Sequence, residues 1–399
     1  MFMRMRLTEW LVVLSFWAVP SQLFASAYFG HAQRQSDLSG ETSWTETGNV
    51  SKNFEIFLIC LFTLLIFVYL FQKSKPAQLG LARSTVWLAV TGFTLLFSLL
   101  VNFNSWPIAA ILRILIFGFL IFVVRREGLT RQFTRVLAKN AAVLVLVSLV
   151  FIFLDPSYAS APCRLDKCSP LGLLYNSFYP HQNYLALVML SVLPLLFILE
   201  NRWIRYSSVA ITLLLIVATG ARVAYLAVLV LSILYISKLK RWGSLIPALG
   251  VLFSLFIFVV TKGDDLTGRG YIYQVIKDNF AKHGIFGYGP NALADAYQSS
   301  SISFLAYHDH GAAPSLIDRY GLLVFVGVFA TLLAFGVALA KRHKSLQMSK
   351  LYPLIALAFT FGSETSLQID FLSLSAWAVY LFISATRDQE LSEQSAQSL

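Results

Sequence analysis

Charged side chains are scarce in this 399-residue sequence, where Asp, Glu, Lys and Arg together make up 13%. Soluble globular domains carry about 25%, so the composition argues against a water-soluble protein. Hydrophobic residues account for 57%, and many lie in apolar runs of roughly 16–22 residues, the length at which a helix crosses a bilayer. Shorter segments with apolar and polar residues in alternation, which would mark a membrane β-barrel, are absent.

Cysteine is also rare, with three residues. Cys60 lies within an apolar run and is expected to act as inert packing. Cys163 and Cys168 stand in the polar stretch APCRLDKCSP, where an oxidising compartment would permit a disulfide, with two free thiols as the alternative. The sequence also lacks a Walker A loop, a Rossmann fingerprint and a helix with clustered metal ligands.

The apolar runs predict an all-α polytopic membrane protein, because a backbone in lipid must satisfy its own hydrogen bonds. The first run follows the basic start MFMRMR, so a cleavable signal peptide is an alternative to the retained first helix that we favour. After Arg387 the tail is polar and is expected to be loose. About twelve spans are predicted, near residues 7–29, 55–72, 84–103, 106–124, 140–154, 183–199, 207–220, 223–237, 244–261, 319–340, 351–364 and 369–385.

The formal net charge of +11 follows from this topology. When loops are assigned alternately to the two sides, most Lys and Arg residues fall on the side of both termini, and most acidic residues fall opposite. Because cytoplasmic loops of membrane proteins are enriched in Lys and Arg, the termini are predicted to be cytoplasmic. The basic balance therefore needs no nucleic-acid partner, and we expect none; the bilayer itself is the expected surrounding.

The longest polar stretch is predicted to form a large outer-face loop at residues 261–318, between the ninth and tenth spans. It divides the chain into N-terminal membrane helices (1–260), the loop, C-terminal membrane helices (319–385) and a tail (386–399). The loop holds three of the six histidines and a glycine-rich turn. We expect most of any chemical site here, and the residues concerned are Gly284, Gly287, Gly289, Pro290, His283, His308 and His310.

Three arginines near the outer face are candidate anion ligands, because a guanidinium can donate two parallel hydrogen bonds to phosphate. Arg222, in ATGARVAYL, lies at the hinge between two spans, although it could equally snorkel to the interface. Arg269 opens the loop, where an arginine is usually just solvated. Arg113 lies inside a span, where a charge is costly, so it either lines the same cavity or pairs with Asp370 or Glu364.

The second candidate group is His308, Asp309 and His310. Together with the two cysteines it suggests zinc, but the spacing fits no standard zinc pattern, so no metal and no other cofactor is predicted. A histidine, which titrates near neutral pH, is a better candidate for a general base. Two arginines and a histidine on one face favour chemistry on a lipid that bears phosphate.

These elements together resemble the O-antigen ligase and polymerase superfamily of bacterial membrane glycosyltransferases. The resemblance lies in the Arg hinge ATGARVAYL, in TGRGYIYQVIKDNFAKHGIFGYGP, and in His310, which stands eleven residues before Gly321. The stretch YPHQNYLA, with His181 and Asn183, matches a further element. The sequence departs from the family in having Gly311 where asparagine is usual. The likeness covers roughly residues 170 to 385, and its motifs are specific only in combination.

The resemblance implies a GT-C-like fold in the bacterial inner membrane and transfer of a glycan from undecaprenyl diphosphate to a sugar hydroxyl at the periplasmic face. The acceptor would be the lipid A core, for a ligase, or growing polysaccharide, for a polymerase. The reaction would be metal-independent and inverting. Arg222 and Arg269 would hold the diphosphate and His310 would be the general base, with Arg113, His308 and Asn183 as further substrate-binding residues. A transporter of lipid-linked or anionic solutes and a catalytically silent family member remain alternatives.

Overall fold

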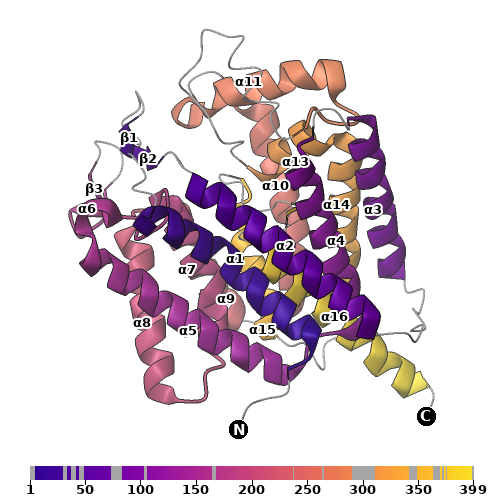
Figure 1. The fold of residues 1–399 in the computed structure, drawn as a ribbon, viewed down its shortest axis with the longest axis horizontal. Helices are drawn as coiled ribbons and strands as arrows, with labels where there is room; N and C mark the ends of the chain where they lie inside the picture. Colours follow the sequence, from indigo (N-terminus) through magenta and orange to yellow (C-terminus); the bar gives the residue numbers. More distant parts are fainter. Residues whose placement is uncertain are drawn as a thin grey trace.

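A computed structural model describes residues 5–29, 34–36, 42–44, 49–72, 83–102, 106–163, 168–236, 238–262, 265–289, 311–340, 348–362, 369–370, 373 and 375–397. Within these residues the chain is overwhelmingly helical, and six helices are long and apolar enough to cross a membrane. The protein therefore has the all-α membrane fold predicted from its apolar runs. Figure 1 shows these helices packed into one bundle.

Five of the six long apolar helices coincide with single helical elements, and the sixth, Trp242–Val260, joins the short helix η2 to α10. Three shorter apolar helices, within α3, α7 and α9, match further predicted spans. A total of about twelve spans stays a prediction. The elements are α1 (Leu7–Phe29), α2 (Asn49–Gln72), α3 (Arg83–Val101), α4 (Ile108–Glu127), α5 (Arg131–Leu154), α7 (Gln182–Leu196), α9 (Arg222–Ile236), η2 (Lys238–Leu245), α10 (Ile246–Val260) and α14 (Leu322–Ala340).

The remaining described elements complete the bundle and its edges. Two antiparallel hairpins pair β1 with β2 and β3 with β4, with Arg34 opposite Trp44 and Ser160 opposite Tyr175. The elements are α6 (Pro156–Ala159), α8 (Arg202–Ala218), α11 (Asp265–His283), α13 (Ala312–Tyr320), α15 (Met348–Ala358), α16 (Ala376–Gln397), β1 (Arg34–Ser36), β2 (Thr42–Trp44), β3 (Ser160–Pro162) and β4 (Leu173–Tyr175).

Several predicted boundaries were wrong. Helix α5 begins at Arg131, between the spans predicted near 106–124 and 140–154, because the Thr130 side chain caps it by accepting a hydrogen bond from the Phe133 N–H. Phe133 and Leu137, four residues apart, are buried together on its inner side. At the other end of the chain, α16 begins only at Ala376 and then continues to Gln397, through the tail that was expected to be loose.

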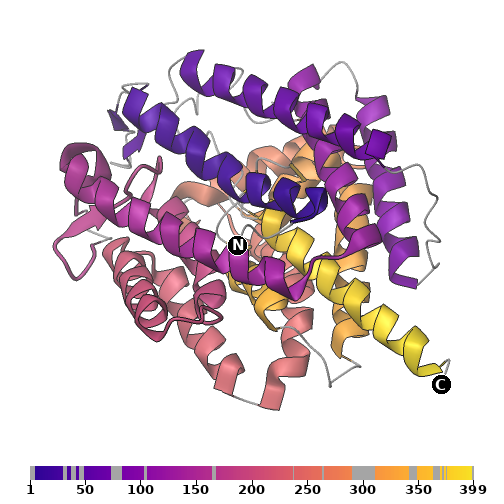
Figure 2. The ribbon, with the colours of Figure 1, turned by 60° about the horizontal axis from the view of Figure 1, so that its bottom comes forward.

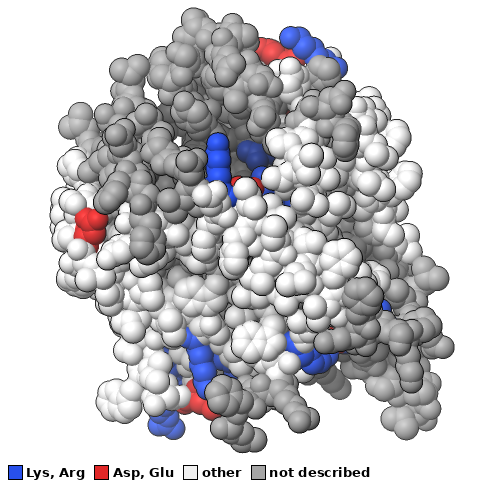
Figure 3. All heavy atoms as spheres, viewed as in Figure 1, with Lys and Arg blue, Asp and Glu red and all other residues white. Residues whose placement is uncertain are grey.

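The bundle has two distinct ends, which Figure 1 places at the bottom and the top. The end that carries both termini is called the terminal end here, and the opposite one the α11 end. In the space-filling view of Figure 3, charged side chains gather near these two ends and a largely uncharged band lies between them. An apolar band between two charged rims is the surface that a bilayer requires.

Charged side chains at the terminal end, one of them fully buried, tie four helices and their linkers together. Arg6 donates to the carbonyl oxygens of Glu127 and Gly128, and the Tyr69 hydroxyl donates to the Glu127 carboxylate at 2.6 Å. Lys350, which is fully buried, donates to the Leu129 carbonyl and to Ser384. Charges taken out of water require such partners, so this network fixes α1, α2, α15 and α16 around the α4–α5 turn.

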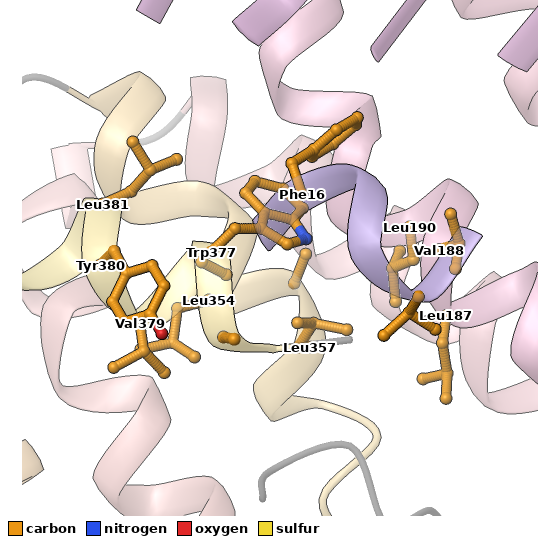
Figure 4. Close-up of a cluster of buried hydrophobic side chains, with 14 of the residues drawn as sticks. Phe16, Leu187, Val188, Leu190, Leu354, Leu357, Trp377, Val379, Tyr380 and Leu381 are labelled. Carbon is orange, nitrogen blue, oxygen red and sulfur yellow. The ribbon is translucent and has the colours of Figure 1, made fainter. Parts of the chain in front are cut away.

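The apolar core lies where α1 crosses α7, α15 and α16. Phe16 of α1 packs edge-on against Trp377 of α16, with ring centroids 5.2 Å apart. Figure 4 shows this pair beside leucine side chains of α7 and α15. Helix α1 thus packs as part of the bundle. Figure 2, which brings the terminal end forward, shows α1 between α2 and α5, as in Figure 1.

Candidate active site

Helix α11 lies across one end of the bundle (Figure 1) and is anchored on the last turn of α10. Tyr273 is fully buried and packs against Phe258 of α10, with ring centroids 5.5 Å apart. The Lys277 ammonium donates to the carbonyl oxygens of Val259 and Thr261 at 3.2 and 3.3 Å, so it caps the C-terminal end of α10. Desolvation lowers the pKa of Lys277, and the nearby Lys262 charge lowers it further.

Helix α13 shows that the predicted outer loop is more than a loop. Ala312, Ala313 and Leu316 are fully buried, and α13 packs against α10, α11 and α14. The Ala313 N–H donates to Ser254 of α10 at 2.9 Å. The segment predicted to be an outer-face loop therefore contains a helix that belongs to the core.

Gly311, which replaces the asparagine usual in the resembling family, begins α13 with a φ of +100°. An L-residue rarely adopts this conformation, whereas glycine does so readily. His310 is the residue before Gly311 in the chain, so the predicted base directly precedes the buried start of α13. His310 itself, with His308 and Asp309, lies outside the described residues.

The glycine-rich turn after α11 is held by direct backbone contact with the end of α13. The Tyr288 N–H donates to the Asp318 carbonyl at 2.7 Å, and the Leu322 N–H donates to the Gly284 carbonyl at 2.8 Å. Ser98 of α3 contacts the Phe286 carbonyl at 2.6 Å. The turn was expected to serve a site, and the structure gives its glycines a packing role.

Alanine at Gly287 or Gly321 is expected to destabilise the protein by about 3 kcal/mol or more, since each has a positive φ and no room for a Cβ. A Cβ on Gly287 would lie 2.5 Å from the Gly321 nitrogen, and one on Gly321 would lie 2.4 Å from the Ile285 carbonyl oxygen. Gly172→Ala is the matched control, with a φ of +78° but no atom within 4 Å. Thermal unfolding in detergent should show a much smaller loss for Gly172→Ala; equal losses would contradict the close contact.

A small cavity of about 10 Å³, room for about one water molecule, lies between α11, this turn and α13. Asn279 and the buried Asp318 contribute polar groups to its lining. The Asn279 side-chain nitrogen is buried and donates to no acceptor within the described residues. The cavity therefore has a polar wall directly beneath the glycine-rich turn.

Arg113 of α4 forms ion pairs with two carboxylates. Its guanidinium lies 3.3 Å from Glu55 of α2 and 3.3 Å from Asp370, which precedes α16. Pairing with Asp370 was one of the two roles predicted for this arginine, and it is confirmed. Glu364, the other predicted partner, lies outside the described residues. Glu55 was missed, because no local pattern places the start of α2 beside α4.

Arg222 opens α9, directly after the hinge that turns α8 back into the bundle. Gly220 makes this turn with a φ of +65°, and a Cβ there would lie 3.3 Å from the Cys168 carbonyl carbon. The hinge thus lies against the β3–β4 hairpin, which a disulfide between Cys163 and Cys168 closes. This disulfide confirms one of the two predicted states of the cysteines, and Arg222 is exposed beside it.

The disulfide predicts a simple labelling result. In the unreduced, denatured protein, alkylation is expected to modify Cys60 alone, since it is the free cysteine, and reduction should add two labelled thiols. Replacing both Cys163 and Cys168 by serine should cost about 2 kcal/mol, the loop-closure value for so short a loop. Mass spectrometry of labelled peptides and thermal unfolding check both expectations; three labelled thiols before reduction would contradict the bond.

Asn183 lies in the first turn of α7, where its N–H donates to the Nδ1 atom of His181 at 3.1 Å. His181 is the N-cap of this helix, so at least part of the YPHQNYLA element serves to start α7. Arg269 belongs to α11, one turn before Tyr273, and its side chain lies outside the described residues. Asn183, Arg113 and Arg222 lie in the first two turns of α7, α4 and α9.

No protein-family model matches this chain, and no curated protein matches it with significance. Within the described residues there is also no cluster of metal-binding side chains. The case for a function therefore rests on the residues themselves and on the motif resemblance.

Proposed function

We propose that this protein is a membrane glycosyltransferase of the O-antigen ligase and polymerase type. It would move a glycan from undecaprenyl diphosphate to a sugar hydroxyl of the lipid A core or of a growing polysaccharide. The observation that carries the proposal is the order of three elements around the outer segment. These are Arg222 at the α8–α9 hinge, Arg269 in α11, and His310 directly before the buried helix α13.

The disulfide supports the orientation that this function needs. Structural disulfides persist in oxidising compartments such as the periplasm. Cys163 and Cys168 lie beside the Arg222 hinge, whereas the termini lie at the opposite end of the bundle (Figure 1). We therefore propose an inner-membrane protein with cytoplasmic termini, whose site faces the periplasm, where lipid-linked glycans are used.

In the proposed reaction the acceptor hydroxyl attacks the anomeric carbon of the donor glycan. The new bond joins the acceptor oxygen to that carbon, while the bond to the diphosphate oxygen breaks and its electron pair leaves with undecaprenyl diphosphate. His310 takes the hydroxyl proton, which makes the oxygen a better nucleophile. A single in-line displacement inverts the configuration at the anomeric carbon.

Arg222 and Arg269 would bind the diphosphate of the donor. Negative charge builds on the leaving diphosphate as the bond breaks, so two guanidinium groups stabilise the transition state more than the ground state. Arg113 has a different part in this proposal. Because its charge is already balanced by Glu55 and Asp370, it holds α2, α4 and the segment before α16 in place beside the site. Asn183 and His308 would contact the glycan.

A transporter of lipid-linked or anionic solutes is the second candidate, since the same arginines would serve a binding site. The two functions differ in their need for a base. Purified protein in sealed liposomes would be given a fluorescent lipid-linked glycan, and transfer to an acceptor and movement across the bilayer would be measured together. In an enzyme His310→Ala removes transfer; in a transporter it leaves movement largely intact, and no transfer is seen in the wild type.

A further inference from the structure

The terminal end carries a basic surface shared by two helices, α5 and α8. Arg135 and Lys139 are exposed and stand four residues apart on α5, so they lie on the same side of that helix. Arg202 and Arg205 are three residues apart in the first turns of α8. Arg135 reaches Glu200, just before α8, at 2.8 Å, which brings the two pairs together. These four cationic side chains are called the α5–α8 basic surface.

The charge of this surface is only partly neutralised. Four cations and the one carboxylate of Glu200 leave a local net charge of 4 − 1 = +3. Within the described part of the chain, Arg202, Arg205 and Lys139 make no ion pair, in contrast to Arg113. Figure 3 shows blue and red side chains together at the lower rim of the molecule. A bound anion would neutralise the remaining positive charge of this surface.

Aromatic side chains lie beside the same arginines. Trp203 is 85% exposed and Tyr206 is 62% exposed, and the two are three residues apart on α8. The Arg205 guanidinium lies 5.0 Å above the Tyr206 ring. Further along α8, Leu213 and Leu214 are also exposed. Exposed Trp and Tyr between an apolar face and water are typical of the headgroup level of a bilayer.

Position and charge together point to a lipid rather than a soluble anion. Arg202 and Arg205 share the first turns of α8 with the aromatic pair, and Arg135 reaches Glu200 just before them. In a bilayer that surrounds the uncharged band, all of them would lie near the phosphates of the adjacent leaflet. Basic pockets between membrane helices on the cytoplasmic side bind anionic headgroups, and each Lys or Arg near the surface contributes to that binding. Guanidinium groups are well suited to phosphate oxygens.

We propose that the α5–α8 basic surface binds an anionic phospholipid of the terminal-end leaflet, with a two-phosphate headgroup such as that of cardiolipin. Four cations grouped on two helices match two phosphates better than one. Trp203 and Tyr206 would pack against the glycerol and upper acyl chains. This site lies at the opposite end from the Arg222 hinge and does not depend on the proposed transfer reaction.

Native mass spectrometry of the full-length protein tests this site with added cardiolipin, phosphatidylglycerol and phosphatidylethanolamine. Wild type is expected to keep bound cardiolipin and to prefer it over the zwitterionic lipid. Arg202→Ala combined with Arg205→Ala should weaken cardiolipin binding by roughly 10–100-fold, whereas Lys52→Ala with Lys282→Ala, at the α11 end, should leave it unchanged. Arg202→Lys with Arg205→Lys should restore most of the binding.

The result that would overturn the proposal is equal cardiolipin binding by wild type and the Arg202/Arg205 double alanine variant, with both unfolding at the same temperature in detergent. An equal rise in the unfolding temperature of the wild type with inorganic pyrophosphate and with cardiolipin, at the same concentration, would also overturn it. The site would then take a soluble anion. If the alanine variant unfolds at a lower temperature, the lysine variant, which keeps the charges, is compared with wild type instead. Most of the cardiolipin binding should remain in it, and loss of that binding in a folded lysine variant would contradict the proposal.

Discussion

Replacing His310 by alanine is expected to lower the rate of glycan transfer by about 10²–10⁴-fold, the usual contribution of a general base. The acceptor hydroxyl is a poor nucleophile at neutral pH, and without a base its proton remains on the attacking oxygen in the transition state. Binding of the lipid donor should change little, since the histidine acts on the acceptor. Initial rates of transfer in proteoliposomes, at saturating donor, measure the loss.

His283→Ala is the matched control for this prediction, because His283 ends α11 and has no part in the proposed chemistry. It should transfer glycan at nearly the wild-type rate. The rate of His310→Ala should also respond weakly to pH between 5 and 8, where a catalytic histidine normally titrates. A His310→Ala rate within a few-fold of wild type would remove the general-base role.

Arg222→Ala and Arg269→Ala are each expected to lower the transfer rate constant by about 10²–10³-fold, as when a donor to a developing anion is lost. The effect should fall mainly on kcat, because the diphosphate that the guanidinium groups bind gains its full negative charge only as it leaves. Lysine at either position should recover part of the rate, since it keeps the charge but cannot donate two parallel hydrogen bonds.

The double variant sharpens this test. If Arg222 and Arg269 hold the same diphosphate, the two alanine substitutions together should cost less than the sum of their single effects. Lys282→Ala, on the exposed side of α11, is the control and should keep normal kinetics. Full additivity, or a change in KM alone, would place the arginines at separate sites or in ground-state binding.

The helical membrane fold was predictable because run length and hydropathy depend on each segment by itself. The predicted helix boundaries were wrong where a capping residue or a tertiary contact sets the end of a helix. Thr130 starts α5 inside a basic stretch, and α16 begins at Ala376, after residues that were counted as part of a span. Helix α13 was missed because its small residues become apolar packing only beside α10 and α14.

The candidate site was predictable where a charged residue inside a span needs a partner to offset the free energy of burying its charge. An arginine within a span needs a carboxylate, so the pair of Arg113 with Asp370 could be named in advance, although Glu55 depends on the packing of α2 and could not. The glycine-rich turn shows the opposite case: its spacing suggested a binding loop, but Gly287 and Gly321 serve a close backbone contact. Lys277 as the cap of α10 had no sequence signal.

The most direct measurement is transfer by the purified protein in a reconstituted system. Undecaprenyl-diphosphate oligosaccharide would be supplied with and without lipid A core, in the presence of EDTA, and the products identified by mass spectrometry. We predict glycan attached to the core, or lengthened glycan on the carrier lipid, with release of undecaprenyl diphosphate and an inverted linkage. If the wild-type protein leaves every donor tested intact while remaining folded and membrane-inserted, the proposed activity is wrong.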